Sequence, residues 1–263
     1  MTKSNDMLEI KTVNDANSIR FDFNRKPCYL IFRGHSKIVK TQPLPRLYRK
    51  NYNERSIIRD FMHIAPGLIS KTPNEDNYVH WISLMQHHGA STRLLDWTES
   101  ILVALFFAVY NQKYDSEDAE ICEIDANGLN MVSDIQLPNE DNPLLQYLAQ
   151  ESLYSDKIIL AEKCGISDNI PAWPIAFIPT YFWSRMVAQR SIFTIHPKPR
   201  DNDHVFPEEA ELKRYVIRAK NKKRIRTELT AICIDLHTLF PDLDALSKEL
   251  SDTHLLANRK KRT

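Results

Sequence analysis

Arg33 has the surroundings that most readily suggest chemistry, because it follows an apolar, β-rich segment at residues 28–32 and precedes Gly34. An arginine at the end of a strand can hold a diphosphate with its planar fork of N–H donors. A glycine beside it leaves room for a phosphate to approach the backbone. The alternative is a structural arginine that ties the strand to a carboxylate such as Asp96, and the spacing favours neither interpretation.

A second group of polar side chains lies in the sequence QHHGASTRLLDWT, residues 86–98. The helix before it is predicted to end at Gly89, and residues 90–98 are predicted to form a loop. The candidate ligand-binding residues here are His88, Thr92, Arg93 and Asp96. The alternative is that Asp96 pairs with Arg93 and helps to cap the next helix, while the histidines form hydrogen bonds in the core.

A third segment, RMVAQRSIFTIH at residues 185–196, places Gln189 and Ser191 at the entrance to an expected strand. Polar groups at the edge of a sheet can contact a ligand, so both are candidate site residues. Taken alone, this segment is weak support for a site.

These residues must be positioned by strands and helices, and the order of the expected elements predicts an α+β fold. It would have a small mixed or antiparallel sheet and several surrounding helices. About four to six short strands are expected from the alternation of apolar residues. The clearest lie at residues 28–32, 120–124, 191–196 and 212–219, with a shorter extended segment at 175–178. A turn is expected at residues 125–128, directly after the second of these strands. Helices are predicted to begin near Asn53, near Asn74 or Asn77, and at Asp242, which can cap a helix. Thr98 is the expected N-cap of an apolar helix from Glu99, and a brief helix is expected at residues 184–188.

Composition limits the other possibilities. The chain has 263 residues, a net charge of +1 and four widely spaced cysteines. We expect no disulfide framework or zinc module, and no metal at the adjacent His87 and His88, which cannot share one helical face. Neither a secretion signal nor a membrane-spanning run is recognised, so a cytoplasmic protein without membrane contact is predicted. The five glycines form neither a GxGxxG nor a P-loop pattern.

Four successive motifs in the chain resemble the FRG domain family: residues 29–34 (YLIFRG), 86–98, 188–193 (AQRSIF) and 238–244 (TLFPDLD). The resemblance implies an FRG domain over residues 25–250, an N-terminal strand and helix in residues 1–24 packed on it, and a basic tail over residues 251–263. It also implies a bacterial protein with a role in phage defence. The sequence departs from the family pattern at Ala90-Ser91 and at Arg190-Ser191.

The order of Arg33, Ser191 with Thr194, and Glu211 with Glu209 is similar to that of the ADP-ribosyltransferases. This resemblance implies NAD as a substrate, with Arg33 anchoring the diphosphate, Ser191 shaping the nicotinamide pocket and Glu211 stabilising an oxocarbenium-like ribose. Arg33, Ser191 and Glu211 would then be the catalytic residues of an ADP-ribosyltransferase-like enzyme. The acceptor of the ADP-ribosyl group is not identified.

Two other functions stay open. A non-catalytic module would bind a nucleotide or a partner protein through Arg33, Arg93 and His88. A metal-dependent nuclease would use Asp96, Asp242 and Asp244 to hold a cation. We favour the transferase narrowly over the binding module, and place the nuclease last.

Overall fold

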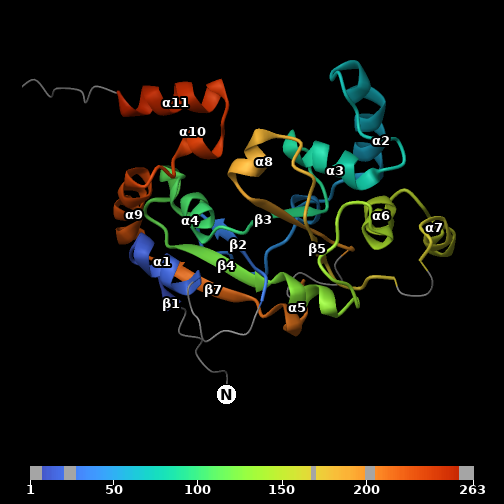
Figure 1. The fold of residues 1–263 in the computed structure, drawn as a ribbon, viewed down its shortest axis with the longest axis horizontal. Helices are drawn as coiled ribbons and strands as arrows, with labels where there is room; N and C mark the ends of the chain where they lie inside the picture. The colour runs from blue at the N-terminus through green and yellow to red at the C-terminus, as the bar shows by residue number, and fades with distance from the viewer. Residues whose placement is uncertain (1–7, 21–27, 167–169, 199–204, 255–263) are drawn as a thin grey trace, which may run out of the picture.

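The fold is built on one open, mixed sheet of seven strands (Figure 1). The computed structural model describes residues 8–20, 28–166, 170–198 and 205–254. Along the sheet, the strands are β1 (Leu8–Glu9), β7 (Lys213–Ile217), β4 (Ala119–Asp125), β2 (Leu30–His35), β3 (Leu94–Thr98), β6 (Ser191–Ile195) and β5 (Ile175–Phe177). β1 and β7 are parallel, and all other neighbours are antiparallel. The predicted α+β class is confirmed, with more strands than expected.

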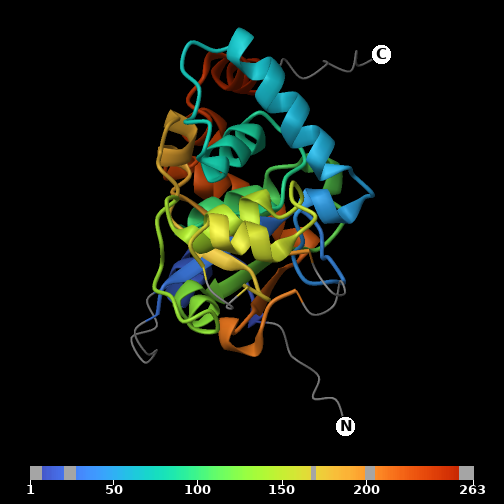
Figure 2. The same ribbon diagram turned by 90° about the vertical axis from the view of Figure 1, so that its right-hand side faces the viewer.

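One face of the sheet is covered by two groups of helices that lie side by side. Phe32 of β2 points into the first group, and Leu94 of β3 points into the second. The first group is α1 (Val13–Arg20), α4 (Ile101–Val109), α9 (Ala219–Ala231) and α10 (Leu236–Leu239). The second group is α2 (Glu54–Ile64), α3 (Tyr78–His87), α6 (Pro143–Gln150) and α7 (Lys157–Lys163), which Figure 2 shows from the side.

The opposite face of the sheet carries a third apolar cluster. It contains Ile31, Leu95 and Trp97, together with Leu129 of α5 (Ala126–Met131). The remaining helices are α8 (Ser184–Ala188) and α11 (Leu243–Thr253), with short 3-10 helices η1 (Arg46–Arg49), η2 (Ala65–Gly67), η3 (Gln112–Tyr114) and η4 (Glu208–Ala210). Among the described residues, no helix has both the length and the apolar character needed to cross a membrane.

The sheet separates between β2 and β3. β2 pairs with β4 along its whole length, and β3 pairs with β6 in the same way. The pairing of β2 with β3, however, consists of the single pair Phe32 and Thr98. Beyond that pair the two strands diverge, which leaves backbone and side-chain polar groups of both strands available at the gap.

Several helix boundaries follow local signals in the sequence. The side chains of Asn53, Asn77 and Asp242 each accept a backbone N–H at the start of a helix. Of the two candidate starts Asn74 and Asn77, the structure has Asn77. Gly89 follows α3 with φ of 80°, a left-handed conformation that suits glycine. These features depend on neighbouring residues alone, so they could be located from the sequence.

The predicted loop at residues 90–98 is wrong in its second half, because residues 94–98 form β3, a central strand. Leu94 and Thr98 are buried on one face, and Leu95 and Trp97 on the other. A strand buried on both faces lacks the alternation of apolar and polar residues that marks a strand in sequence. The next helix is capped by Ser100 rather than by Thr98.

Three smaller predictions also need correction. β2 continues through Arg33 to His35, so Arg33 lies within the strand rather than at its end. The expected turn after residue 124 is the short helix α5. Most of the predicted basic tail at residues 251–263 lies outside the described residues.

Candidate functional site

A cavity of about 280 Å³ lies on the helix-covered face, next to the gap between β2 and β3. Three elements meet there: β2 and β3 form the floor, and α8 leads into Gln189 and Ser191 at one wall. We call it the Arg33 cavity. It is lined by Phe32, Arg33, Gly34, Gln86, Asp96, Trp97, Thr98, Phe107, Arg185, Gln189 and Ser191.

Arg33 spans the gap between the two strands. Its Nη1 donates to the backbone carbonyl of Asp96 at 2.5 Å and lies 3.8 Å from that residue's carboxylate. Its Nε donates to Nε2 of His35 at 3.0 Å. The Arg33 side chain is 19% exposed, so the guanidinium is held by protein on one side and is open to the cavity on the other.

His35 and Glu120 orient Arg33 from behind. Because Nε2 of His35 accepts the Arg33 N–H, the proton of the neutral ring must be on Nδ1, which faces Glu120 at 3.1 Å. Burial lowers the pKa of His35, and the positive charge of Arg33 adds to this effect. Glu120 also accepts a hydrogen bond from Arg214. The chain from Glu120 through His35 therefore holds the Arg33 guanidinium in one orientation.

A second chain of hydrogen bonds orients Asp96. Thr92 Oγ1 donates to Gln86 at 2.5 Å, and Gln86 Nε2 donates to Asp96 Oδ2 at 2.8 Å. The Asp96 side chain remains 55% exposed. The polar residues of segment 86–98 thus place one accessible carboxylate beside Arg33. Thr92 acts through Gln86 and does not line the cavity itself.

The remaining wall comes from α8 and the start of β6. Gln189 Nε2 donates to the backbone carbonyl of Leu239. The backbone carbonyl of Gln189 accepts a hydrogen bond from the Thr98 hydroxyl. The Arg185 guanidinium lies 4.4 Å from the centre of the Phe240 ring. Residues of the 238–244 motif therefore hold the α8 side of the cavity in place.

Gly34 serves packing more than ligand access. A Cβ at this position would overlap the backbone carbonyl oxygen of Ala104 in α4. The glycine is required because β2 lies directly against that helix. This is a different reason from the phosphate approach that the sequence suggested, although Gly34 does line the cavity.

The cavity has more positive than negative charge. Burial lowers the pKa of both Arg33 and Arg185, and Asp96 opposes the shift in each case. Both guanidiniums remain cationic at physiological pH. Among the described residues that line the cavity, Asp96 is the one that carries a carboxylate. Two partly desolvated cations facing one carboxylate favour an anionic ligand.

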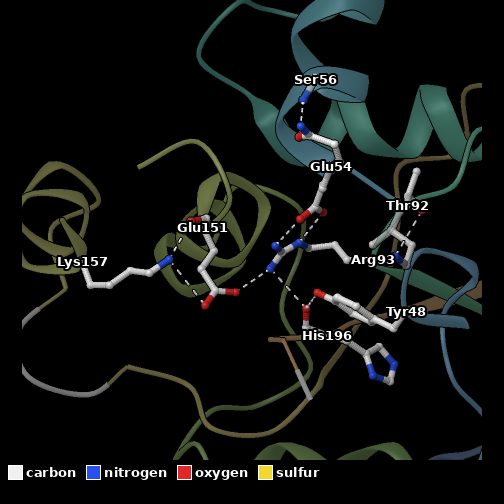
Figure 3. A network of polar contacts seen from close by, with 10 residues as sticks. Tyr48, Glu54, Ser56, Thr92, Arg93, Glu151, Lys157 and His196 are labelled. Atoms are coloured by element: carbon white, nitrogen blue, oxygen red, sulfur yellow. Dashed lines mark hydrogen bonds and ion pairs between the residues drawn. The ribbon is translucent and has the colours of Figure 1, made fainter. Parts of the chain in front are cut away.

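Arg93 lies elsewhere, in the buried network of Figure 3. Its Nε and Nη2 donate to the two oxygens of Glu54 at 2.7 and 2.6 Å, and its Nη1 donates to Glu151 at 2.8 Å and to the carbonyl of His196 at 3.3 Å. The Arg93 side chain is only 2% exposed. It therefore ties β3 to α2 and α6 and does not share a cavity with Arg33.

Glu211 and His88 also lie away from the Arg33 cavity. Glu211 has φ of 47° and its side chain is 68% exposed, next to Lys213. His88 is exposed at the end of α3. Thr194 faces the opposite side of the sheet from Ser191, where it accepts a hydrogen bond from Trp97. The structure thus brings together Arg33, Gly34, Asp96, Gln189 and Ser191 of the predicted site.

Arg185 and Gln86 belong to the cavity although the sequence did not select them. Arg185 precedes Gln189 by four residues, a spacing that places two side chains on the same helical face. That spacing is a signal that could have identified Arg185. Gln86 lies in the polar segment but is separated from Asp96 by ten residues, and only the pairing of α3 with β3 brings them together.

Two groups of described residues have a spacing that would suit a metal ion. The first is His35, Glu120 and Cys122, whose ligand atoms lie within 4.8 Å of one another. Its donor atoms are engaged, however, because His35 accepts from Arg33 and Glu120 accepts from Arg214. Burial also raises the pKa of Cys122 to about 12, which disfavours a thiolate. These residues fit the role of orienting Arg33.

The second group is Asp235, His237 and Glu249, at the junction of α10 and α11. Asp235 caps α10, and Glu249 accepts the backbone N–H of His237. These contacts explain the arrangement without a ligand.

Comparison with known proteins gives one match. Residues 29–117 match the family model of the FRG domain. That segment contains β2 with Arg33, α3 with Gln86, and β3 with Asp96, but not Arg185, Gln189 or Ser191. No curated protein and no solved structure matches the chain.

Proposed function

We propose that this chain, which carries an FRG domain at residues 29–117, binds NAD at the Arg33 cavity and cleaves the bond between its nicotinamide and ribose. One observation carries the proposal. Two partly buried guanidiniums, those of Arg33 and Arg185, face the cavity, and Asp96 carries the carboxylate among its described lining residues. The diphosphate of a dinucleotide would balance the positive charge of these two arginines. Its ribose would lie opposite the Asp96 carboxylate.

Cavity size and lining suit the nicotinamide end of NAD. A volume of about 280 Å³ lies near the lower limit for small-molecule pockets, so it suits one half of a dinucleotide better than the whole. Phe107 offers apolar surface for the nicotinamide ring, and Gln189 and Ser191 offer hydrogen-bonding groups. Arg33 would bind the diphosphate at the mouth of the cavity.

The reaction needs an electrostatic contribution from the protein. The glycosidic carbon loses its bond to the pyridinium nitrogen, which keeps the electron pair. A nucleophilic oxygen of water or an acceptor forms the new bond and releases its proton to solvent. A carboxylate facing the developing positive charge on the ribose contributes about 3 kcal/mol or more. Asp96 is the carboxylate in position for this role, in place of Glu211.

A second candidate is a module that binds the nucleotide without cleaving it. The position of Glu211 favours this candidate, because the acidic residue that the transferase resemblance implied lies outside the cavity. In that case Asp96 would orient Arg33 and take no part in a reaction.

A binding and release experiment separates the two candidates. NAD and ADP-ribose are titrated into wild-type protein, Arg33→Ala and the control Arg59→Ala, which alters an exposed arginine of α2. Loss of a charged hydrogen bond predicts at least about tenfold weaker binding in Arg33→Ala and no change in the control. Equal affinity for all three proteins would refute the site.

Cleavage is then measured as release of nicotinamide from labelled NAD, with water, protein and nucleic acid as acceptors. We expect wild-type protein to release nicotinamide and Asp96→Asn to be slower by about a hundredfold, with NAD affinity nearly unchanged. Binding without release under all conditions would support the non-catalytic module instead.

A further inference from the structure

A second, larger cavity of about 700 Å³ lies between the segment from η1 to the start of α2 and the end of α6. It shares no lining residue with the Arg33 cavity. Its floor is the buried Arg93 network of Figure 3, and its rim includes Lys157 and Lys198. We call it the cationic cavity. Its volume falls within the range of pockets that enclose a nucleotide-sized ligand.

The charges around this cavity are strongly unbalanced. Six cationic side chains line it, against two carboxylates, those of Glu54 and Glu151. Both carboxylates are already bound to Arg93. Glu151 also pairs with Lys157, so the two carboxylates balance Arg93 and Lys157. The net charge of the cavity is left to Arg49, Lys50, Arg55 and Lys198.

Lys50 and Arg55 are the cations most available to a ligand. Both are exposed, and in the described part of the chain neither forms an ion pair. Arg55 lies in the first turn of α2, an 11-residue helix whose N-terminus borders the cavity. The helix dipole adds partial positive charge at that end, which favours an anion.

Ser152 gives a second, independent indication. Its hydroxyl oxygen is buried at the cavity wall and has no hydrogen-bond partner in the described residues. An unpaired buried hydroxyl costs about 1–3 kcal/mol, so a polar ligand atom reaching it would be stabilised. On the opposite wall, the half-buried ring of Tyr52 provides a flat surface on which a base can stack.

We propose that the cationic cavity is a second binding site, for a phosphate ester of nucleotide size. The phosphate lies against Lys50, Arg55 and the N-terminus of α2, and the base lies against Tyr52. A free nucleotide and the phosphorylated end of a nucleic acid carry the same recognised chemistry. This site is independent of NAD binding at the Arg33 cavity.

The test uses binding of inorganic phosphate, AMP and uncharged adenosine, measured by calorimetry. To weaken binding at the Arg33 cavity, every protein carries Arg33→Ala. The first variant adds Lys50→Ala and Arg55→Ala, and the matched control adds Arg59→Ala and Lys71→Ala, which remove two exposed cations outside the cavity. All four positions are exposed, so circular dichroism should show unchanged folding.

We expect AMP to bind, adenosine to bind at least tenfold more weakly, and the Lys50/Arg55 variant to lose at least tenfold in AMP affinity. The control should bind as its parent does. Absence of AMP binding, or equal loss in both variants, would overturn the proposal. A 5′-phosphorylated oligonucleotide is tested in parallel. Tighter binding than AMP identifies a nucleic-acid end as the source of the phosphate, and equal binding identifies a free nucleotide.

Discussion

Replacing Arg93 with methionine should destabilise the protein strongly while leaving the Arg33 cavity intact. The substitution keeps a long, unbranched side chain but removes hydrogen bonds to Glu54, Glu151 and the carbonyl of His196. Two carboxylates that now share one guanidinium would face each other without a cation between them.

The magnitude follows from burial. Removing one partner of a buried ion pair costs about 3–5 kcal/mol. Glu54 and Glu151 retain 10% and 20% exposure, so water can reach them in part. We therefore expect the lower end, about 3 kcal/mol in the free energy of unfolding. For a chain of this size, that corresponds to a fall in Tm of about 6–12 °C.

The assay is urea denaturation followed by circular dichroism, with Arg33→Ala as the comparison. Arg33 is partly exposed and makes two hydrogen bonds within the protein, so its removal should cost only about 1 kcal/mol. Adding Glu54→Gln and Glu151→Gln to Arg93→Met should recover at least about 1 kcal/mol, because the unpaired charges are removed. A loss below about 1 kcal/mol in Arg93→Met, or no recovery in the triple variant, would refute the reasoning.

Three further predictions concern the supports of the site and the core. Gly34→Ala should cost about 3 kcal/mol in urea denaturation, because the new methyl group overlaps the backbone of α4; a stable variant would show that the helix can shift. His35→Leu should weaken NAD binding at least about tenfold and His35→Gln should restore most of it, since glutamine can still accept the Arg33 N–H; equal binding by both would rule out this orienting role. Burial lowers the pKa of His196 from 6.5 to about 3, so between these pH values the unfolded chain binds a proton that the folded protein does not. The free energy of unfolding should therefore fall as the pH drops below about 6.5, by up to about 1.4 kcal/mol per pH unit. The urea midpoints at pH 7 and pH 5 should differ less in His196→Gln than in the wild-type protein.

Local sequence signals located much of the secondary structure. The predicted helix at residues 184–188 has the observed bounds of α8. Helices also begin at Asn53 and Asp242 as expected, and at Asn77, one of the two candidates for the start of α3. A cap or a glycine C-terminus depends on a few adjacent residues, so a pattern in the sequence is enough to find it. β3 was missed because both of its faces are buried, which removes the alternation on which the prediction relied.

The sequence by itself determined the two family motifs at residues 29–34 and 86–98, which lie within the matched segment, and the helix starts at Asn53 and Asp242. It also identified Arg33 and Asp96 as candidates for one site. Only the tertiary structure decided which candidate residues share a cavity and which have a structural role. Arg33 and Arg93 look alike in sequence, but one faces a cavity and the other is buried between Glu54 and Glu151. The difference depends on the separation of β2 from β3 and on where α2 and α6 pack. These are contacts between residues distant in the chain, which a local pattern cannot encode.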